Sequence, residues 1–162
     1  RIGLLGQQPL LFPHLDVLGN VAYGPRAQRL RRDEARALAL EMLERLDAAD
    51  LASRRPGELS GGQAARVALA RALATRPRAM LIDEPFAAVD VEYTPRLRVA
   101  VKAALAEVGC PCIIVTHDPA DVAALADDVA VLDNGRIVEH GPAAEVMARP
   151  ESSFGKLLFT QK

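Results

Sequence analysis

The apolar positions along the chain alternate between short uniform runs and stretches with a helical period. Residues 79–82 and 112–116 are short, apolar and rich in branched side chains, which is typical of parallel strands buried on both faces. An earlier apolar opening ends where Gln7, Gln8 and Pro9 break the periodicity. The pattern therefore predicts strands that alternate with helices.

Helical segments separate these runs. Asp16 is placed to cap a short helix over 17–22, which we expect the Gly24-Pro25 pair to end. Apolar residues recur at intervals of three and four over 35–46, with charged residues opposite them, and this spacing predicts an amphipathic helix.

Three more helices are predicted further along the chain. Ser60 is a suitable N-cap for a helix that must stop before Pro77. Thr94 as N-cap, with Pro95 in the first helical position, predicts a helix to about residue 108, and 119–126 is also read as helical.

A hairpin closes the pattern. Residues 129–132 and 136–139 flank an Asn134-Gly135 pair, which favours the positive backbone angles of a tight turn. Strand, helix, strand, helix and a terminal hairpin predict an α/β core, into which 25–77 is inserted as a helical subdomain.

Composition narrows the class of protein. The chain has 162 residues, half of them apolar, which is enough to form the core of one domain. Lysine and arginine number 20 against 21 acidic residues, so the balance predicts no nucleic-acid partner. Cys110 and Cys112 are separated by a single residue. This spacing fits neither a usual zinc site nor a redox pair, and we interpret both as small apolar core residues.

The first candidate site is the start of the helix after Ser60, in the run Leu59, Ser60, Gly61, Gly62 and Gln63. Free backbone N–H groups at a helix N-terminus, next to two glycines and a hydroxyl, form a site for phosphate. The alternative is an ordinary serine cap with flexible glycines.

The other candidates follow the apolar runs. Asp83 and Glu84 end one strand, and phosphoryl transfer needs one carboxylate for Mg²⁺, usually through water, and a second to polarise the attacking water. His117 follows the next strand, where an imidazole can hydrogen-bond a terminal phosphate or order the water. Gln7 can coordinate Mg²⁺ or water without adding charge, and Asp90 lies in a loop that could face a partner. For each of these residues taken alone, the structural explanation is the stronger one.

In this order the segments resemble the nucleotide-binding subunit of ATP-binding-cassette (ABC) transporters, over nearly the whole chain. Residues 59–63 resemble the family's signature, and 79–84 its Walker B strand, with Glu84 as the implied catalytic carboxylate. His117 matches the switch histidine, Gln7 the Q-loop glutamine and Asp90 the D-loop aspartate, although the loop lacks the usual serine at Ala87.

The resemblance implies a P-loop NTPase-like parallel sheet, with 25–77 as the helical subdomain, 78–141 as the core with its hairpin, and 142–162 as a helical tail. The phosphate-loop pattern G-x-x-x-x-G-K-[ST] does not occur in the sequence. In this family that loop precedes the Q-loop. We therefore expect the chain to be the C-terminal portion of a subunit, incomplete at its N-terminus, with apolar sheet surface exposed and marginal stability in isolation.

The resemblance also implies cofactors and partners. ATP and Mg²⁺ would be sandwiched between two cassette subunits, Asp83 and Gln7 serving the metal and the signature of each chain serving the nucleotide of the other. Transmembrane permease subunits, and indirectly a substrate-binding protein, would be partners at the cytoplasmic face of the plasma membrane, where the chain would be peripheral. The segment at Leu11, Phe12 and Leu15 would form part of the permease contact.

The sequences of the Q-loop segment, 11–14, and of the closing segment, 139–142, most resemble those of importers of molybdate or related oxyanions. Two alternatives stay open. One is a non-hydrolysing or truncated cassette that only lends its signature in trans. The other is an ABC ATPase of the DNA-repair or chromosome-maintenance type, which the absence of sustained heptads and the net charge of −1 disfavour.

Overall fold

The structure is a computed structural model that describes residues 1–160. The chain forms two compact units, Arg1–Val115 and Thr116–Lys162. Within the described part of the chain, none of the helices has both the length and the apolar character needed to cross a membrane.

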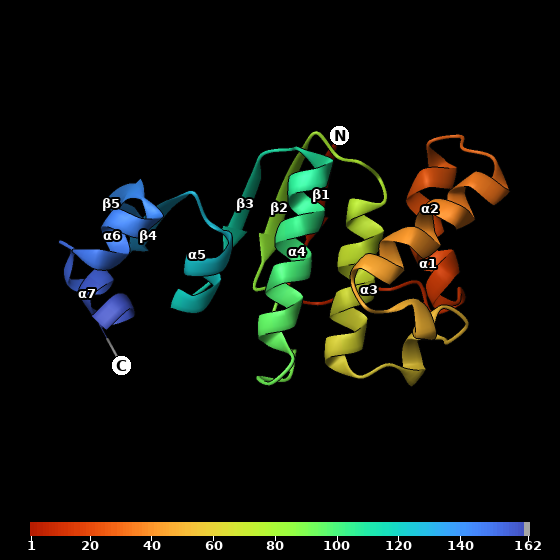
Figure 1. The fold of residues 1–162 in the computed structure, drawn as a ribbon, viewed down its shortest axis with the longest axis horizontal. Helices are drawn as coiled ribbons and strands as arrows, with labels where there is room; N and C mark the ends of the chain where they lie inside the picture. Colours follow the sequence, from red (N-terminus) through yellow and green to blue (C-terminus); the bar gives the residue numbers. More distant parts are fainter. Residues whose placement is uncertain (161–162) are drawn as a thin grey trace. The chain divides into compact units, whose positions relative to one another are not determined.

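The first unit contains a parallel three-stranded sheet, with the helices of residues 17–73 beyond the edge formed by its first strand (Figure 1). Its strands are β1 (Ile2–Leu5), β2 (Ala79–Asp83) and β3 (Cys112–Val115), hydrogen-bonded in that order. The predicted α/β architecture with a parallel sheet is confirmed. All three carboxyl ends therefore lie at one edge of the sheet, where parallel α/β folds place their ligands.

The two faces of this sheet differ. Met80 and Ile82 of β2 are fully buried, and α3 (Gly61–Leu73) packs against β1 on the covered side. The opposite face carries the exposed side chains of Ile2, Leu4, Leu81, Ile113 and Val115. Both segments form the predicted strands, but the predicted burial is complete only at Met80 and Ile82, because helices cover one face of the sheet. The expected exposure of apolar sheet surface is observed.

Helix α1 (Val17–Ala27) begins as predicted, with the Asp16 carboxylate accepting a hydrogen bond from Gly19 N at 2.6 Å. It does not end at Gly24-Pro25. Pro25 lies near the helix end, where its missing N–H costs one hydrogen bond, and its ring is buried. A Cβ on Gly24 would lie 2.4 Å from Thr75 Cγ2, so this glycine permits close packing instead of stopping the helix.

The helical segment continues with α2 (Arg32–Arg45), two short 3₁₀ turns, η1 (Ala49–Leu51) and η2 (Pro56–Glu58), and then α3. The amphipathic prediction for α2 is confirmed, because its i, i+4 positions Ala35, Ala39 and Leu43 are completely buried. Helices α1, α2 and α3 pack on one another.

Helix α4 (Thr94–Val108) ends at Gly109, whose φ of +63° is the left-handed value that glycine tolerates best. The cap position is Tyr93 and not Thr94 as predicted. Thr94 is already helical, and its hydroxyl donates to the Asp90 carbonyl at 2.9 Å instead of accepting from an amide.

The second unit contains α5 (Pro119–Leu125), a hairpin of β4 (Asp128–Asp133) and β5 (Arg136–Pro142), α6 (Ala143–Ala148) and α7 (Ser153–Thr160). Asn134 and Gly135 have φ values of +48° and +75°, as the predicted tight turn requires. The last two residues of the predicted tail, 161 and 162, lie outside the described residues. The division into 25–77, 78–141 and 142–162 stays a prediction.

Candidate functional site

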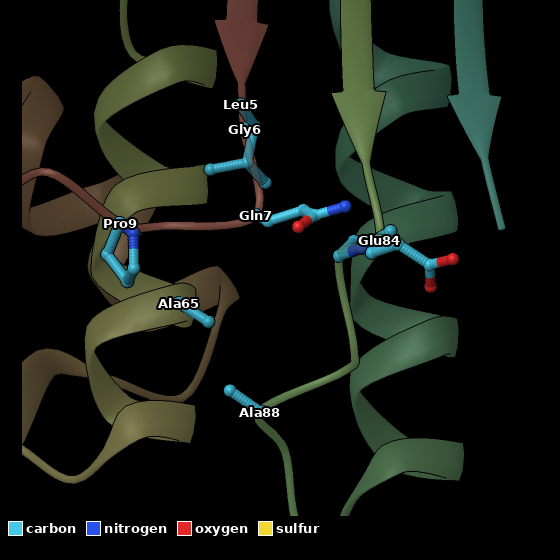
Figure 2. Close-up of a pocket in the computed structure, with 8 residues that line it drawn as sticks. Leu5, Gly6, Gln7, Pro9, Ala65, Glu84 and Ala88 are labelled. Carbon is cyan, nitrogen blue, oxygen red and sulfur yellow. The ribbon is translucent and has the colours of Figure 1, made fainter.

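The carboxyl ends of β1 and β2 bring two predicted site residues together. Gln7 follows β1 by two residues and Glu84 follows β2 directly. In Figure 2 the Gln7 amide extends toward Glu84, while the Glu84 carboxylate points away from it. They share a small pocket whose lining is Leu5, Gly6, Gln7, Pro9, Ala65, Glu84, Pro85 and Ala88.

The backbone of Glu84 is strained. Its φ is +50°, a left-handed value that costs a non-glycine residue about 1–3 kcal/mol and that clusters at active sites. Its N–H donates to the Val115 carbonyl at 2.9 Å, which ties the residue to the end of β3. The structure therefore holds this carboxylate at a fixed turn beyond the sheet, where a residue that acts on a ligand would lie.

Asp83 is the last residue of β2 and is half-buried. Because strand side chains alternate, Asp83 shares the open face with Leu81, while Met80 and Ile82 belong to the covered face. The chain turns immediately afterwards at Glu84. Two adjacent carboxylates thus leave the strand in different directions, as the division into a metal ligand and a base requires.

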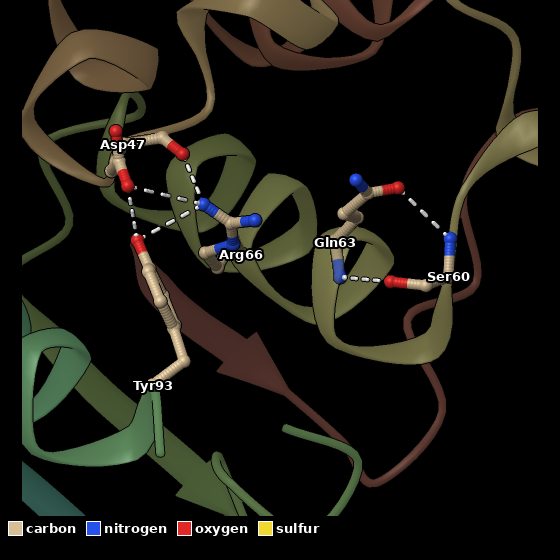
Figure 3. Close-up of polar contacts among 5 residues, drawn as sticks. All are labelled: Asp47, Ser60, Gln63, Arg66 and Tyr93. Carbon is tan, nitrogen blue, oxygen red and sulfur yellow. Dashed lines mark hydrogen bonds and ion pairs between the residues drawn. The ribbon is translucent and has the colours of Figure 1, made fainter. Parts of the chain in front are cut away.

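The N-terminus of α3 is capped in both directions (Figure 3). Gln63 N donates to Ser60 Oγ at 3.3 Å, and Ser60 N donates to Gln63 Oε1 at 3.0 Å. Leu59 precedes this box and is half-buried, whereas Ser60 and Gly61 are exposed. The predicted serine cap is confirmed. The reciprocal role of Gln63 was missed, although the S-x-x-Q spacing signals it.

The two glycines of this helix face the loop that leads to Asp90. A Cβ on Gly62 would lie 3.2 Å from Ala88 O and 3.3 Å from Val89 Cα, and one on Gly61 would lie 3.4 Å from Ala88 Cβ. The first turn of α3 and this loop are thus in close contact within one chain. Asp90 itself is exposed.

The segment after Gln7 is held by two side chains that sequence reasoning did not single out. Arg71 of α3 donates to the carbonyls of Pro9 (3.0 Å) and Leu10 (2.9 Å), and its guanidinium lies 5.3 Å from the Phe12 ring centroid. The fully buried Asn20 exchanges hydrogen bonds with Phe12 N and O. Burial lowers the pKa of Arg71 from its ordinary value.

The leucines of the segment that follows Gln7 differ in exposure. Leu10 is 75% exposed and has a φ of +43°, whereas Leu11 and Leu15 are half-buried. Of the three residues predicted for a permease contact, none is fully buried, and Leu10 is a more prominent surface side chain than any of them.

His117 belongs to the second unit. It is exposed and lies between β3 and α5, directly before Asp118, whose carboxylate accepts from Ala120 N at 2.8 Å and caps that helix. Its predicted role, to hydrogen-bond a terminal phosphate or to order the attacking water, stays a prediction.

The predicted site residues have the chemical groups that Mg²⁺ and a nucleotide phosphate require. Residues 1–160 include no group of three or more His, Cys, Asp or Glu side chains placed to hold a metal ion. Mg²⁺ is usually bound by one or two carboxylates together with phosphate and water, and the Asp83 carboxylate and the Gln7 amide oxygen are hard donors of this kind. The exposed N–H groups around Gly61 suit a phosphate.

Known proteins align with the chain over almost its full length. It is 48% identical to the molybdenum import ATP-binding protein ModC of Mycobacterium tuberculosis, over 96% of the chain and 43% of the relative. Identity is 46% with the Fe(3+) ions import ATP-binding protein FbpC of Pseudomonas fluorescens (94% and 42%). It is 42% with the spermidine/putrescine import ATP-binding protein PotA of Frankia alni (94% and 33%). The chain spans less than half the length of these relatives.

A solved structure supports the same assignment. The ATP-binding cassette MJ0796, in a dimeric post-hydrolysis state bound to ADP and Pi, superposes with a TM-score of 0.78 at 32% identity, over 88% of this chain and 63% of that one. The profile described as ABC transporter matches residues 1–87, which is more than half of the chain. The chain therefore belongs to the ABC transporter family.

Proposed function

We propose that the intact protein to which this chain belongs is the ATP-binding and ATP-hydrolysing subunit of an ABC import system. Within it, Glu84 is the base that polarises the attacking water and His117 assists it. Asp83 and Gln7 serve Mg²⁺, and Ser60, Gly61 and Gly62 bind the phosphates of a nucleotide held by a second subunit. When bound, Mg²⁺ neutralises phosphate charge and supplies Lewis-acid polarisation.

One observation carries this proposal. Gln7 and the strained Glu84 line one pocket at the carboxyl ends of β1 and β2. Gln7 is exposed and Glu84 is half-buried, and a backbone held at a positive φ is retained where surrounding structure and function require it.

The exposure of the signature supports its proposed role in a second subunit's site. Ser60 and Gly61 are exposed, although their helix is capped and its next turns are buried. The N-terminus of α3 therefore offers N–H groups to a partner molecule. The dimeric state of the cassette MJ0796 supports the same arrangement.

ATP hydrolysis with Mg²⁺ by the intact protein tests the proposal. Glu84→Gln keeps the shape of the side chain but removes the base, so we expect the rate to fall by about a hundredfold or more. The matched control is Glu44→Gln on the exposed side of α2, which should leave the rate unchanged. Equal rates for wild type and Glu84→Gln would refute the role of Glu84.

An importer is favoured over a chromosome-type ATPase because the three relatives above are all described as import proteins. Molybdate or a related oxyanion is the proposed cargo, supported by the identity to ModC. A cassette has no physical contact with cargo, so its residues encode this weakly.

Uptake in cells tests the cargo. In a strain that depends on the intact protein, Glu84→Gln should abolish accumulation of molybdate and leave spermidine and Fe³⁺ uptake unchanged. Normal molybdate uptake together with loss of spermidine uptake would assign spermidine as the cargo, and loss of Fe³⁺ uptake would assign Fe³⁺.

A further inference from the structure

A polar cluster of Asp47, Arg66 and Tyr93 joins three segments of the first unit (Figure 3). Asp47 follows α2, Arg66 lies on α3, and Tyr93 is the residue before α4. The Tyr93 hydroxyl donates to Asp47 Oδ2 at 2.6 Å, and Arg66 Nη1 donates to the Tyr93 hydroxyl oxygen at 3.1 Å. Arg66 also donates to the backbone carbonyl of Asp47.

The Arg66 side chain is well ordered by this cluster. Its guanidinium carbon lies 4.6 Å from the centroid of the Tyr93 ring, and the side chain is only 13% exposed. A cation over an aromatic face is attracted by the ring, more strongly as water is excluded. Burial, followed by the hydrogen bond to Asp47, raises the pKa of Tyr93, so its hydroxyl stays protonated and able to donate.

The backbone of Tyr93 in turn fixes the end of the loop that carries Asp90. The Asp90 carbonyl accepts hydrogen bonds from Tyr93 N at 2.9 Å, Thr94 N at 3.0 Å and Thr94 Oγ1 at 2.9 Å. These bonds tie Asp90 to the start of α4, next to the residue whose ring contacts Arg66.

The same loop touches α3 at a second point. Gly62 and Arg66 are four residues apart and so share one face of α3. Gly62 lies against Ala88 and Val89 at one end of the loop, and Arg66 contacts Tyr93 at the other. Two contacts one helical turn apart fix both the position and the direction of the loop relative to the helix.

We propose that Arg66 and Tyr93 are positioning residues that hold the Asp90 loop against the signature helix, so that both surfaces meet a second subunit as one rigid unit. The inference rests on the proposed function, because it assumes that Ser60 and Gly61 bind nucleotide across a dimer. Arg66 and Tyr93 lie outside every motif used for that function, and their role would be in closing the dimer and not in catalysing hydrolysis.

Tyr93→Phe in the intact protein tests the proposal. It removes the hydroxyl and both of its hydrogen bonds but keeps the ring under Arg66. The Tyr93 and Thr94 amides should exchange hydrogen severalfold faster. Because closure becomes harder, the subunit concentration that gives half-maximal ATP hydrolysis should rise about tenfold, while the plateau rate per subunit stays near the wild-type value.

The matched control is Tyr23→Phe, which removes the hydroxyl of the chain's other tyrosine and should change neither readout. Should Tyr93→Phe fail to fold, Arg66→Lys keeps the charge but loses the planar fork, and the same shift in concentration is expected. A merely structural role lowers the plateau rate per subunit, because folded protein is lost, and a lowered plateau overturns the proposal. So does an unchanged concentration dependence.

The failure of the proposed function has a different signature. In that case wild type and Tyr23→Phe hydrolyse no ATP at any concentration, and the inference falls with the function on which it rests. If wild type hydrolyses ATP and Tyr93→Phe matches it, only the inference is wrong.

Discussion

Gly62 is a glycine because of its neighbours and not because of its own backbone angles. It has no positive φ, and alanine is normally preferred in a helix by about 1 kcal/mol. A Cβ at this position would, however, press on Ala88 O and Val89 Cα. The glycine therefore permits the closest approach of the signature helix to the Asp90 loop.

Gly62→Ala should separate this loop from α3 by a few tenths of an ångström. We expect the rate of ATP hydrolysis by the intact protein to fall by about tenfold or more, because small misplacements of binding groups are costly in catalysis. The control is Gly57→Ala, since a Cβ there has no heavy atom within 4 Å. A Gly62→Ala rate equal to that of Gly57→Ala would contradict the contact.

The two cysteines were predicted to be small apolar core residues, and the structure places both only partly in the core. Both are free and half-buried, and burial, followed by the charge of Cys110, raises the pKa of Cys112 to about 11. The Cys112 thiol is therefore protonated at neutral pH and has the character of a small apolar residue in β3.

At the scale of elements, α7 depends on one carboxylate. Glu139 of β5 accepts hydrogen bonds from Glu151 N at 2.8 Å, Ser152 N at 3.1 Å and Ser152 Oγ at 2.6 Å. Ser152 Oγ accepts in turn from Gly155 N at 2.9 Å, inside the first turn of α7. The hydrogen bond from Ser152, then that from Glu151, lowers the pKa of Glu139 from its ordinary value of 4.5.

This lowered pKa predicts how α7 responds to acid. The contribution of Glu139 is complete above pH 4.5 and is lost as the pH falls through its lower folded value. Hydrogen exchange of residues 151–155, corrected for intrinsic rates, should therefore accelerate only below this pH. Glu139→Gln should show the faster exchange already at neutral pH, whereas the exposed Glu145→Gln on α6 should not. Protection independent of both pH and Glu139 would contradict the contact.

The elements most readily predicted from sequence were those with local signals. The Asn134-Gly135 turn, the Ser60 cap and the period of α2 each depend on a few neighbouring residues. The failures had distant causes. Gly24 lies inside a helix, where its lack of a side chain makes room for Thr75, and β3 is half-exposed because helices cover one face of its sheet.

The candidate site shows the same limit. The order of the motifs, through their resemblance to a family, singled out Gln7 and Glu84, and the parallel sheet brings them to one edge. Arg71 and Asn20 escaped notice because their partners, the carbonyls of Pro9, Leu10 and Phe12, leave no trace in side-chain patterns. Arg66 and Tyr93 are 27 residues apart and have no shared motif.

At the scale of the whole molecule, the proposed function requires that the complete site lie across two subunits. One chain would supply Glu84 and Gln7 from the end of the sheet, and the other would supply Ser60 and Gly61 from the start of α3. Both sets are described within Arg1–Val115. A homodimer built this way has two sites, each dependent on both subunits.

The most direct measurement of this claim mixes two inactive variants of the intact protein. Glu84→Gln lacks the base but keeps the signature, and Ser60→Arg blocks the signature but keeps the base. Half of randomly mixed dimers then contain one intact site of two. If the site is shared between subunits, mixing should restore about a quarter of the wild-type rate of ATP hydrolysis. A mixture as inactive as its components would contradict a site shared between subunits.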